Sequence, residues 1–99
     1  MSLPTLEEVM PAIKIQIGPL EDLVFSANLK EVTDLVNDPE AERELKEALV
    51  SRTNFTAEIV DFIKEIQLNN PGNAELDMYC NRYSDCLRQL RKLCKRFLG

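Results

Sequence analysis

The chain has 99 residues, of which 44% are hydrophobic, and it contains no histidine. Its length fits one domain with one hydrophobic core, over residues 1–99. Its net charge of −5 argues against nucleic acid as a partner, because such binding requires Lys and Arg to neutralise phosphates. Without histidine it lacks the commonest general base, so we expect no enzyme activity and no catalytic residues.

The first arm of the predicted fold is a helix with two interruptions. Thr5 and Glu8 have the spacing of a capping box, which marks a helix start. Pro11 makes this first segment short or kinked, and Gly18-Pro19 interrupts the chain again. Because proline suits the first turn of a helix, we expect the next helix to run from about residue 19 to residue 36.

Two further arms follow, and each has a clear start signal. Asp38 can cap a helix that begins at Pro39 and covers about thirty residues, with residues 51–56 as its weak point because Ser, Thr and Asn can bend a helix. Turn-forming residues 69–73 end it, and Asn73 should cap a final helix that runs to about Phe97.

A 3/4 rhythm of apolar residues predicts the core side of the second arm. Arg52 occupies one expected apolar position. Because the connections are short, neighbouring helices should be antiparallel. We therefore predict an all-α fold, an antiparallel three-helix bundle whose first arm is kinked at Gly18-Pro19, or four helices if the amino-terminal piece stands alone. The predicted core positions of the second arm are Ala41, Leu45, Ala48, Phe55, Ile59, Phe62 and Ile66.

The final helix places a basic ending on an acidic chain. Residues 80–99 carry six Lys/Arg and one Asp, whereas residues 1–79 carry six Lys/Arg and sixteen Asp/Glu. One apolar stripe recurs at steps of 4, 3, 4, 3 and 4, through Tyr79, Tyr83, Cys86, Leu90, Leu93 and Phe97. We expect this stripe to complete the core and to leave an outward basic face, formed by Arg88, Arg91, Lys92, Lys95 and Arg96.

The cysteines indicate neither disulfides nor a metal site. Cys80, Cys86 and Cys94 lie in one predicted helix, too far apart to bridge one another. Their spacing does not match a metal-binding hairpin. We expect reduced thiols packed in the apolar stripe, a cytoplasmic location, no metal and no cofactor. No apolar run is long enough to cross a membrane, and no signal-peptide pattern is present.

The predicted helix over residues 19–36 carries a wide apolar arc. One neighbouring helix covers less than this arc. Either the arm contacts both other helices or the amino-terminal segment, or part of the arc stays exposed as a partner-binding patch with an acidic rim. The candidate patch consists of Val24, Glu31, Val32, Asp34, Leu35 and Val36.

The final arm opens with the residues Ala74-Glu75-Leu76-Asp77-Met78-Tyr79-Cys80-Asn81-Arg82-Tyr83 and ends in a basic, aromatic segment. Over roughly residues 19–97 the chain resembles the GAT domain of endosomal sorting adaptors. In that family's third helix, Glu75-Leu76, Asn81 and Phe97 would fill the acidic-leucine, Asn and aromatic positions. The resemblance implies ubiquitin binding through shallow apolar patches and a role in cargo sorting. Amino-terminal domains of syntaxins and BAG domains share the same gross pattern.

We therefore expect a non-catalytic helical protein-interaction module, an adaptor that binds a protein partner such as ubiquitin in endosomal or vesicular trafficking. In one alternative, the basic final helix binds an anionic surface: calmodulin, nucleic acid or acidic lipid, the last through peripheral membrane contact. In another, the chain is a helical oligomer or scaffold subunit that uses the wide apolar arc as its interface. The sequence leaves the oligomeric state open.

Overall fold

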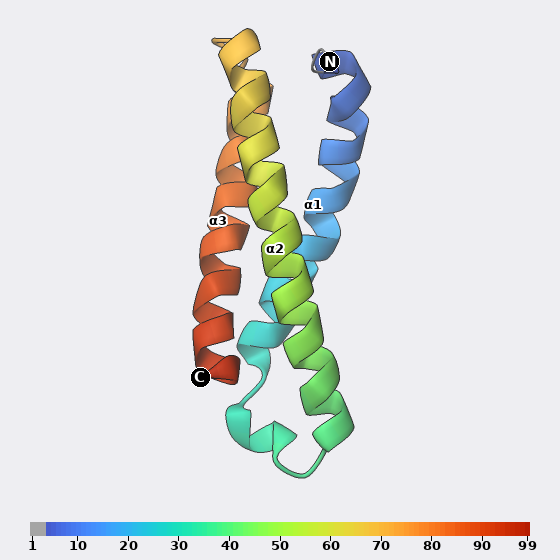
Figure 1. Cartoon of the computed structure of the whole chain (residues 1–99), viewed down its shortest axis with the longest axis vertical. Helices are drawn as coiled ribbons and strands as arrows, with labels where there is room; N and C mark the ends of the chain where they lie inside the picture. Colours follow the sequence, from blue (N-terminus) through green and yellow to red (C-terminus); the bar gives the residue numbers. More distant parts are fainter. Residues whose placement is uncertain (1–3) are drawn as a thin grey trace.

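The computed structural model describes residues 4–99, apart from the side chain of Val32, and it is a three-helix bundle. Helix α1 spans Leu6–Leu29, α2 spans Pro39–Asn69 and α3 spans Ala74–Leu98, with a short 3-10 turn, η1, at Val32–Leu35. Figure 1 shows α1 and α3 running in one direction and α2 returning in the other. The predicted all-α antiparallel bundle is confirmed, and the described residues contain no strand.

Helix α1 is continuous where the sequence suggested interruptions. It remains helical through both Pro11 and Pro19, and Figure 1 draws it as one ribbon. Each proline removes one backbone N–H donor, but its fixed φ is compatible with a helix. The prediction of a separate amino-terminal helix is therefore wrong, and the helices number three within residues 4–99.

The end of α1 also differs from the prediction. The helix stops at Leu29, and Lys30 and Glu31 are extended. The Asp34 carboxylate accepts a hydrogen bond from the Glu31 backbone N–H at 3.1 Å, which stabilises η1 in place of another helical turn. The predicted helix over residues 19–36 thus ends early because a short polar side chain competes for the backbone.

Helix α2 passes through its expected weak point without a break. The hydroxyls of Thr53 and Thr56 donate to the carbonyls of Leu49 and Arg52, one turn back along the same helix. Asp38 caps the start, as its carboxylate accepts from the Ala41 N–H at 3.1 Å. The hydroxyl groups that could have bent the helix form hydrogen bonds within it instead.

The core side of α2 is rotated from the predicted one. Three of the predicted core residues are only half-buried, because α2 packs much less on α1 than on α3. They are Phe55, Ile59 and Phe62. Leu45 and Ile66 are buried as expected. The buried set, which faces mainly α3, is Leu45, Leu49, Thr56, Val60, Ile63 and Ile66.

Helix α3 is the central helix of the bundle, because both other helices pack on it more extensively than on each other. The Asn73 side chain caps it by accepting from the Leu76 N–H at 2.8 Å. One core cluster joins Ile17, Ile63 and Tyr83 near the amino-terminal half of α3, and a second joins Leu49 and Leu90 at the other end. The predicted stripe of α3 lies in these clusters, except that Tyr79 is half-buried.

Candidate anion-binding groove

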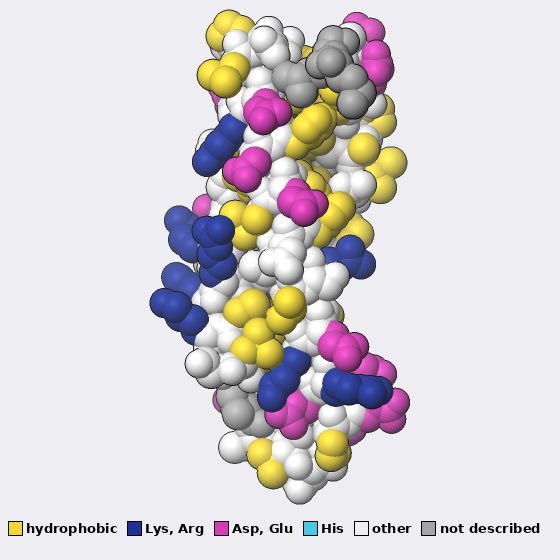
Figure 2. All heavy atoms as spheres, in the orientation of Figure 1, with side chains coloured by type: hydrophobic (Ala, Val, Ile, Leu, Met, Phe, Trp, Pro, Cys, Tyr) yellow, Lys and Arg dark blue, Asp and Glu magenta, His cyan; other side chains and the backbone are white. Residues whose placement is uncertain are grey.

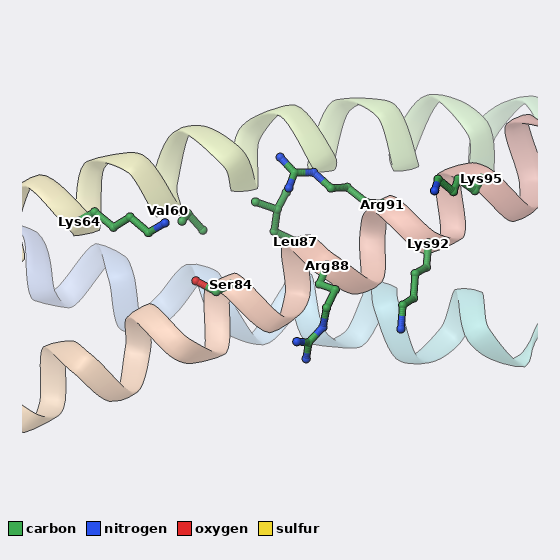
Figure 3. Close-up of a pocket in the computed structure, with 8 residues that line it drawn as sticks. All are labelled: Val60, Lys64, Ser84, Leu87, Arg88, Arg91, Lys92 and Lys95. Carbon is green, nitrogen blue, oxygen red and sulfur yellow. The ribbon is translucent and has the colours of Figure 1, made fainter.

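Basic side chains gather around a groove between α2 and α3. Figure 2 shows Lys and Arg clustered on one side of the molecule, over α3, and Figure 3 shows the groove that they line. The groove has a volume of about 450 Å³. Its lining residues are Val60 and Lys64 from α2 and Ser84, Leu87, Arg88, Arg91, Lys92 and Lys95 from α3. We call this the basic groove.

Helical spacing explains how α3 builds its wall of the groove. Arg88, Arg91 and Lys95 recur at steps of 3 and 4, which places them on one side of the helix. Leu87 turns toward α2 and is 8% exposed, while Val60 opposite it is 4% exposed. The two aliphatic side chains form a floor, and the longer cationic side chains rise from it into solvent.

Most of the positive charge in the basic groove is uncompensated. Arg88 pairs with Asp85, with 2.7 Å between Nη2 and Oδ1. Within residues 4–99, Lys64, Arg91, Lys92 and Lys95 form no ion pair. These four cations therefore line the groove without an internal counterion, which favours a bound anion.

Four of the five residues predicted as a basic face line the groove, and Arg96 does not. Its guanidinium donates to the Lys30 carbonyl at the end of α1, lies 3.6 Å from the Glu31 carboxylate and packs over the Phe97 ring. Arg96 thus fastens the end of α3 to the connection after α1. It stays exposed on α3 but does not line the groove.

Lys64 was missed because its position depends on how two helices pack. It lies on α2, well before α3 in the sequence, and nothing in the periodicity of α3 points to it. A signal does exist in α2 itself, since Lys64 is next to the fully buried Ile63 and one turn after Val60, which places it at the edge of the α3-facing side.

The candidate patch on residues 24–36 does not form as one helical stripe. Leu35 is buried and Val24 is half-buried, both in the second core cluster. Glu31 pairs with Arg96, and Asp34 holds η1. Val36 is 70% exposed, and the side chain of Val32 lies outside the described residues. Leu35 is therefore not available to a partner, because the turn after α1 folds it into the core.

The Cys86 and Tyr83 side chains are placed for packing rather than reactivity. None of the three cysteines forms a disulfide. Burial raises the pKa of the Cys86 thiol to about 11 and that of Tyr83 to about 12, so both stay protonated at neutral pH. Among the described residues, no group of three or more Cys, Asp or Glu side chains is arranged to hold a metal ion, and no helix is long and apolar enough to span a bilayer.

Comparison with known proteins gives no assignment. No family model, curated protein or solved structure matches this chain significantly. The resemblance to GAT domains therefore stays a prediction from the sequence.

Proposed function

We propose that this chain is a non-catalytic protein-interaction module, and that its basic groove binds a short acidic segment of a partner protein. The observation that supports this proposal is that Lys64 from α2 and Arg91 and Lys95 from α3 line one groove without internal counterions in the described residues. A preformed cluster of cations costs little reorganisation when an anionic group binds.

The charge around the basic groove favours a short partner segment over an extended polyanion. The molecule as a whole is acidic, and Asp61 and Glu65 flank Lys64 on α2. Figure 2 shows acidic side chains close above the Lys and Arg cluster. A flat anionic membrane or a long nucleic acid would bring its own charge against these carboxylates, which is unfavourable. A segment of two or three helical turns would cover the cations alone.

The walls of the basic groove also favour a segment that carries both acidic and apolar residues. Val60 and Leu87 supply the floor, and the aliphatic stems of Arg91 and Lys95 line the sides. An amphipathic acidic helix could place apolar side chains over the floor and carboxylates beside the cations. This partner chemistry uses every group that the groove presents.

A narrower proposal is that the partner protein is ubiquitin and that the chain acts in endosomal sorting. This proposal includes an adaptor role and a cytoplasmic location. The unpaired cysteines support a reducing compartment. The patch first proposed for ubiquitin includes the buried Leu35, so only its exposed members, such as Val36, are available for this contact. A titration of labelled ubiquitin against the chain tests the narrower proposal directly.

The basic groove is tested with a labelled helical peptide rich in Glu and Leu and with charge-reversed variants. Arg91→Glu combined with Lys95→Glu should weaken peptide binding roughly tenfold or more, and raising salt from about 50 to 300 mM should weaken wild-type binding. Fluorescence anisotropy measures both effects. Arg52→Glu combined with Lys30→Glu is the matched control, because both cations are exposed and lie outside the groove.

Two results would contradict this proposal. One is the absence of peptide binding up to about 1 mM. The other is equal weakening by the groove variant and by the control, which would show that overall charge alone governs binding. If the chain bound anionic vesicles or duplex DNA more tightly than the acidic peptide, the ligand of the groove would be a membrane or a nucleic acid and not a protein segment.

A further inference from the structure

Helix α1 carries a second stripe with helical spacing, on the side away from the core. Its members recur at steps of 4, 3, 4, 3 and 4, the same rhythm as the core stripe of α3. The buried side of α1 runs instead through Ile13, Ile17 and Leu20, almost opposite on the helix. We call the second stripe the outer seam, and it consists of Pro11, Ile15, Gly18, Asp22, Phe25 and Leu29.

The outer seam leaves its large apolar side chains in solvent. Ile15 is 73% exposed, Phe25 is 68% exposed and Leu29 is 69% exposed. Figure 2 shows hydrophobic side chains along the outer edge of the amino-terminal half of α1. Between residues 9 and 20 the only charged residue is Lys14. A helix that is apolar on both faces is normally covered on both.

Gly18 lies at the middle of the outer seam, and packing within the chain does not explain it. A side chain built at Gly18 would meet nothing within 4 Å. Glycine weakens a helix interior, so its presence there has a cost. The following proline does not require it, because Met10 carries a side chain at the same place before Pro11. A glycine on an open helix face allows another backbone to approach closely.

The spacing of the outer seam is symmetric about residue 20. In two antiparallel α1 helices centred there, Ile15 of each copy faces Phe25 of the other, and Pro11 faces Leu29. Asp22 then faces Gly18 of the other copy, where no side chain competes for room. Large residues meet large ones, and the one charged residue meets the smallest. A two-fold pair requires such self-complementarity.

We propose that two copies of this chain form a two-fold dimer in which α1 packs antiparallel against α1 through the outer seam. The seam extends over about 27 Å of helix, at about 1.5 Å per residue. A second copy fits this face better than a charged partner does, because the seam holds one charge, that of Asp22, and is otherwise uncharged. Two acidic molecules repel least where their surfaces carry least charge.

Sedimentation equilibrium over about 5 to 500 µM protein tests the dimer, because association depends on concentration. The wild-type mass should rise above the monomer value of 11.3 kDa with concentration. Ile15→Glu and Phe25→Lys should each weaken association at least roughly tenfold. Both positions are exposed, so each variant should keep its helical circular dichroism. Leu68→Glu is the matched control, since Leu68 is 83% exposed on α2 and outside the seam.

Mixing the two variants tests the register. In a mixed dimer the introduced carboxylate and ammonium groups would face each other, while the second Ile15–Phe25 contact stays native. Association should therefore recover on mixing. The proposal is overturned if the wild type stays monomeric throughout the range, if Ile15→Glu associates like the wild type, or if mixing restores nothing. Added salt should not weaken this association, whereas it weakens binding in the basic groove.

Discussion

Tyr83 shows how one residue fixes the position of α1. Its side chain is fully buried in the first core cluster, and its hydroxyl donates to the backbone carbonyl of Ile13. That bond joins the central helix to the stretch of α1 between its two prolines. A buried hydroxyl needs a partner, and here the partner belongs to the helix that packs least against the rest of the bundle.

We expect Tyr83→Phe to lower the free energy of unfolding by about 1 kcal/mol, because it removes one buried hydrogen bond while keeping the ring. Urea denaturation monitored by circular dichroism measures this change. Tyr79→Phe is the matched control, since Tyr79 is only half-buried and should change stability less. Equal effects at the two positions would show that the Tyr83 hydroxyl bond adds nothing specific.

Tyr83 and Cys86 together predict a loss of stability at alkaline pH. Burial raises the pKa of Cys86 from 9.0 to about 11 and that of Tyr83 from 10.0 to about 12. At a pH between the ordinary and the raised pKa of each group, that group is deprotonated in the unfolded chain and protonated in the folded chain. Unfolding therefore releases protons, and the free energy of unfolding falls as pH rises, by up to about 1.4 kcal/mol per pH unit for each group.

Urea midpoints measured from pH 8 to pH 11 check this alkaline dependence. The variant Tyr83→Phe combined with Cys86→Ala is less stable at neutral pH, but its midpoint should fall less steeply above pH 9. Parallel curves for the variant and the wild type would mean that other groups cause the alkaline loss.

Arg96 shows that spacing along one helix does not reveal contacts with another helix. Its position after Arg88 and Lys92 predicts the same basic face, yet its neighbour at the end of α3 is the carbonyl end of α1. Unpaired carbonyls at a helix end attract cations. A pattern within α3 could not reveal that attraction, because it depends on where another helix stops.

At the scale of single elements, two of the three predicted caps form. Thr5 makes no side-chain cap at the start of α1, because its hydroxyl donates to the Glu8 carboxylate instead. Asp38 and Asn73 both accept from backbone N–H groups three residues ahead, as their positions before α2 and α3 predicted. Capping is a local interaction within one turn, so sequence alone contains it. The continuity of α1, in contrast, could not be predicted from local sequence. Its two prolines weaken the helix, and packing against α3 stabilises it.

We expect Asp38→Ala to lower the free energy of unfolding by about 1 kcal/mol, because the Ala41 N–H loses its side-chain acceptor. Thermal or urea unfolding measures the loss. Asn37→Ala is the control, since it changes the adjacent exposed residue and leaves the cap intact. A loss of similar size from Asn37→Ala would indicate that the whole connection, rather than the cap, stabilises the start of α2.

At the scale of the whole molecule, the sequence predicted the bundle but only part of its surfaces. Helix number, direction and the core stripe of α3 follow from local periodicity and short connections. The exposure of Phe25 and the position of Lys64 beside α3 follow from the angles at which helices pack, and the burial of Leu35 follows from the turn after α1. Those angles depend on all three helices at once, so no single repeat in the sequence contains them.

The basic groove is built by α2 and α3 alone, and α1 contributes no residue to its lining. Pairing through α1 would therefore leave both grooves of a dimer open. A partner protein with two acidic segments could then engage both, and its second segment would bind at the high effective concentration set by the linker between them. Weak individual contacts would in that case give tight, avidity-dependent capture of bivalent partners and loose contact with monovalent ones.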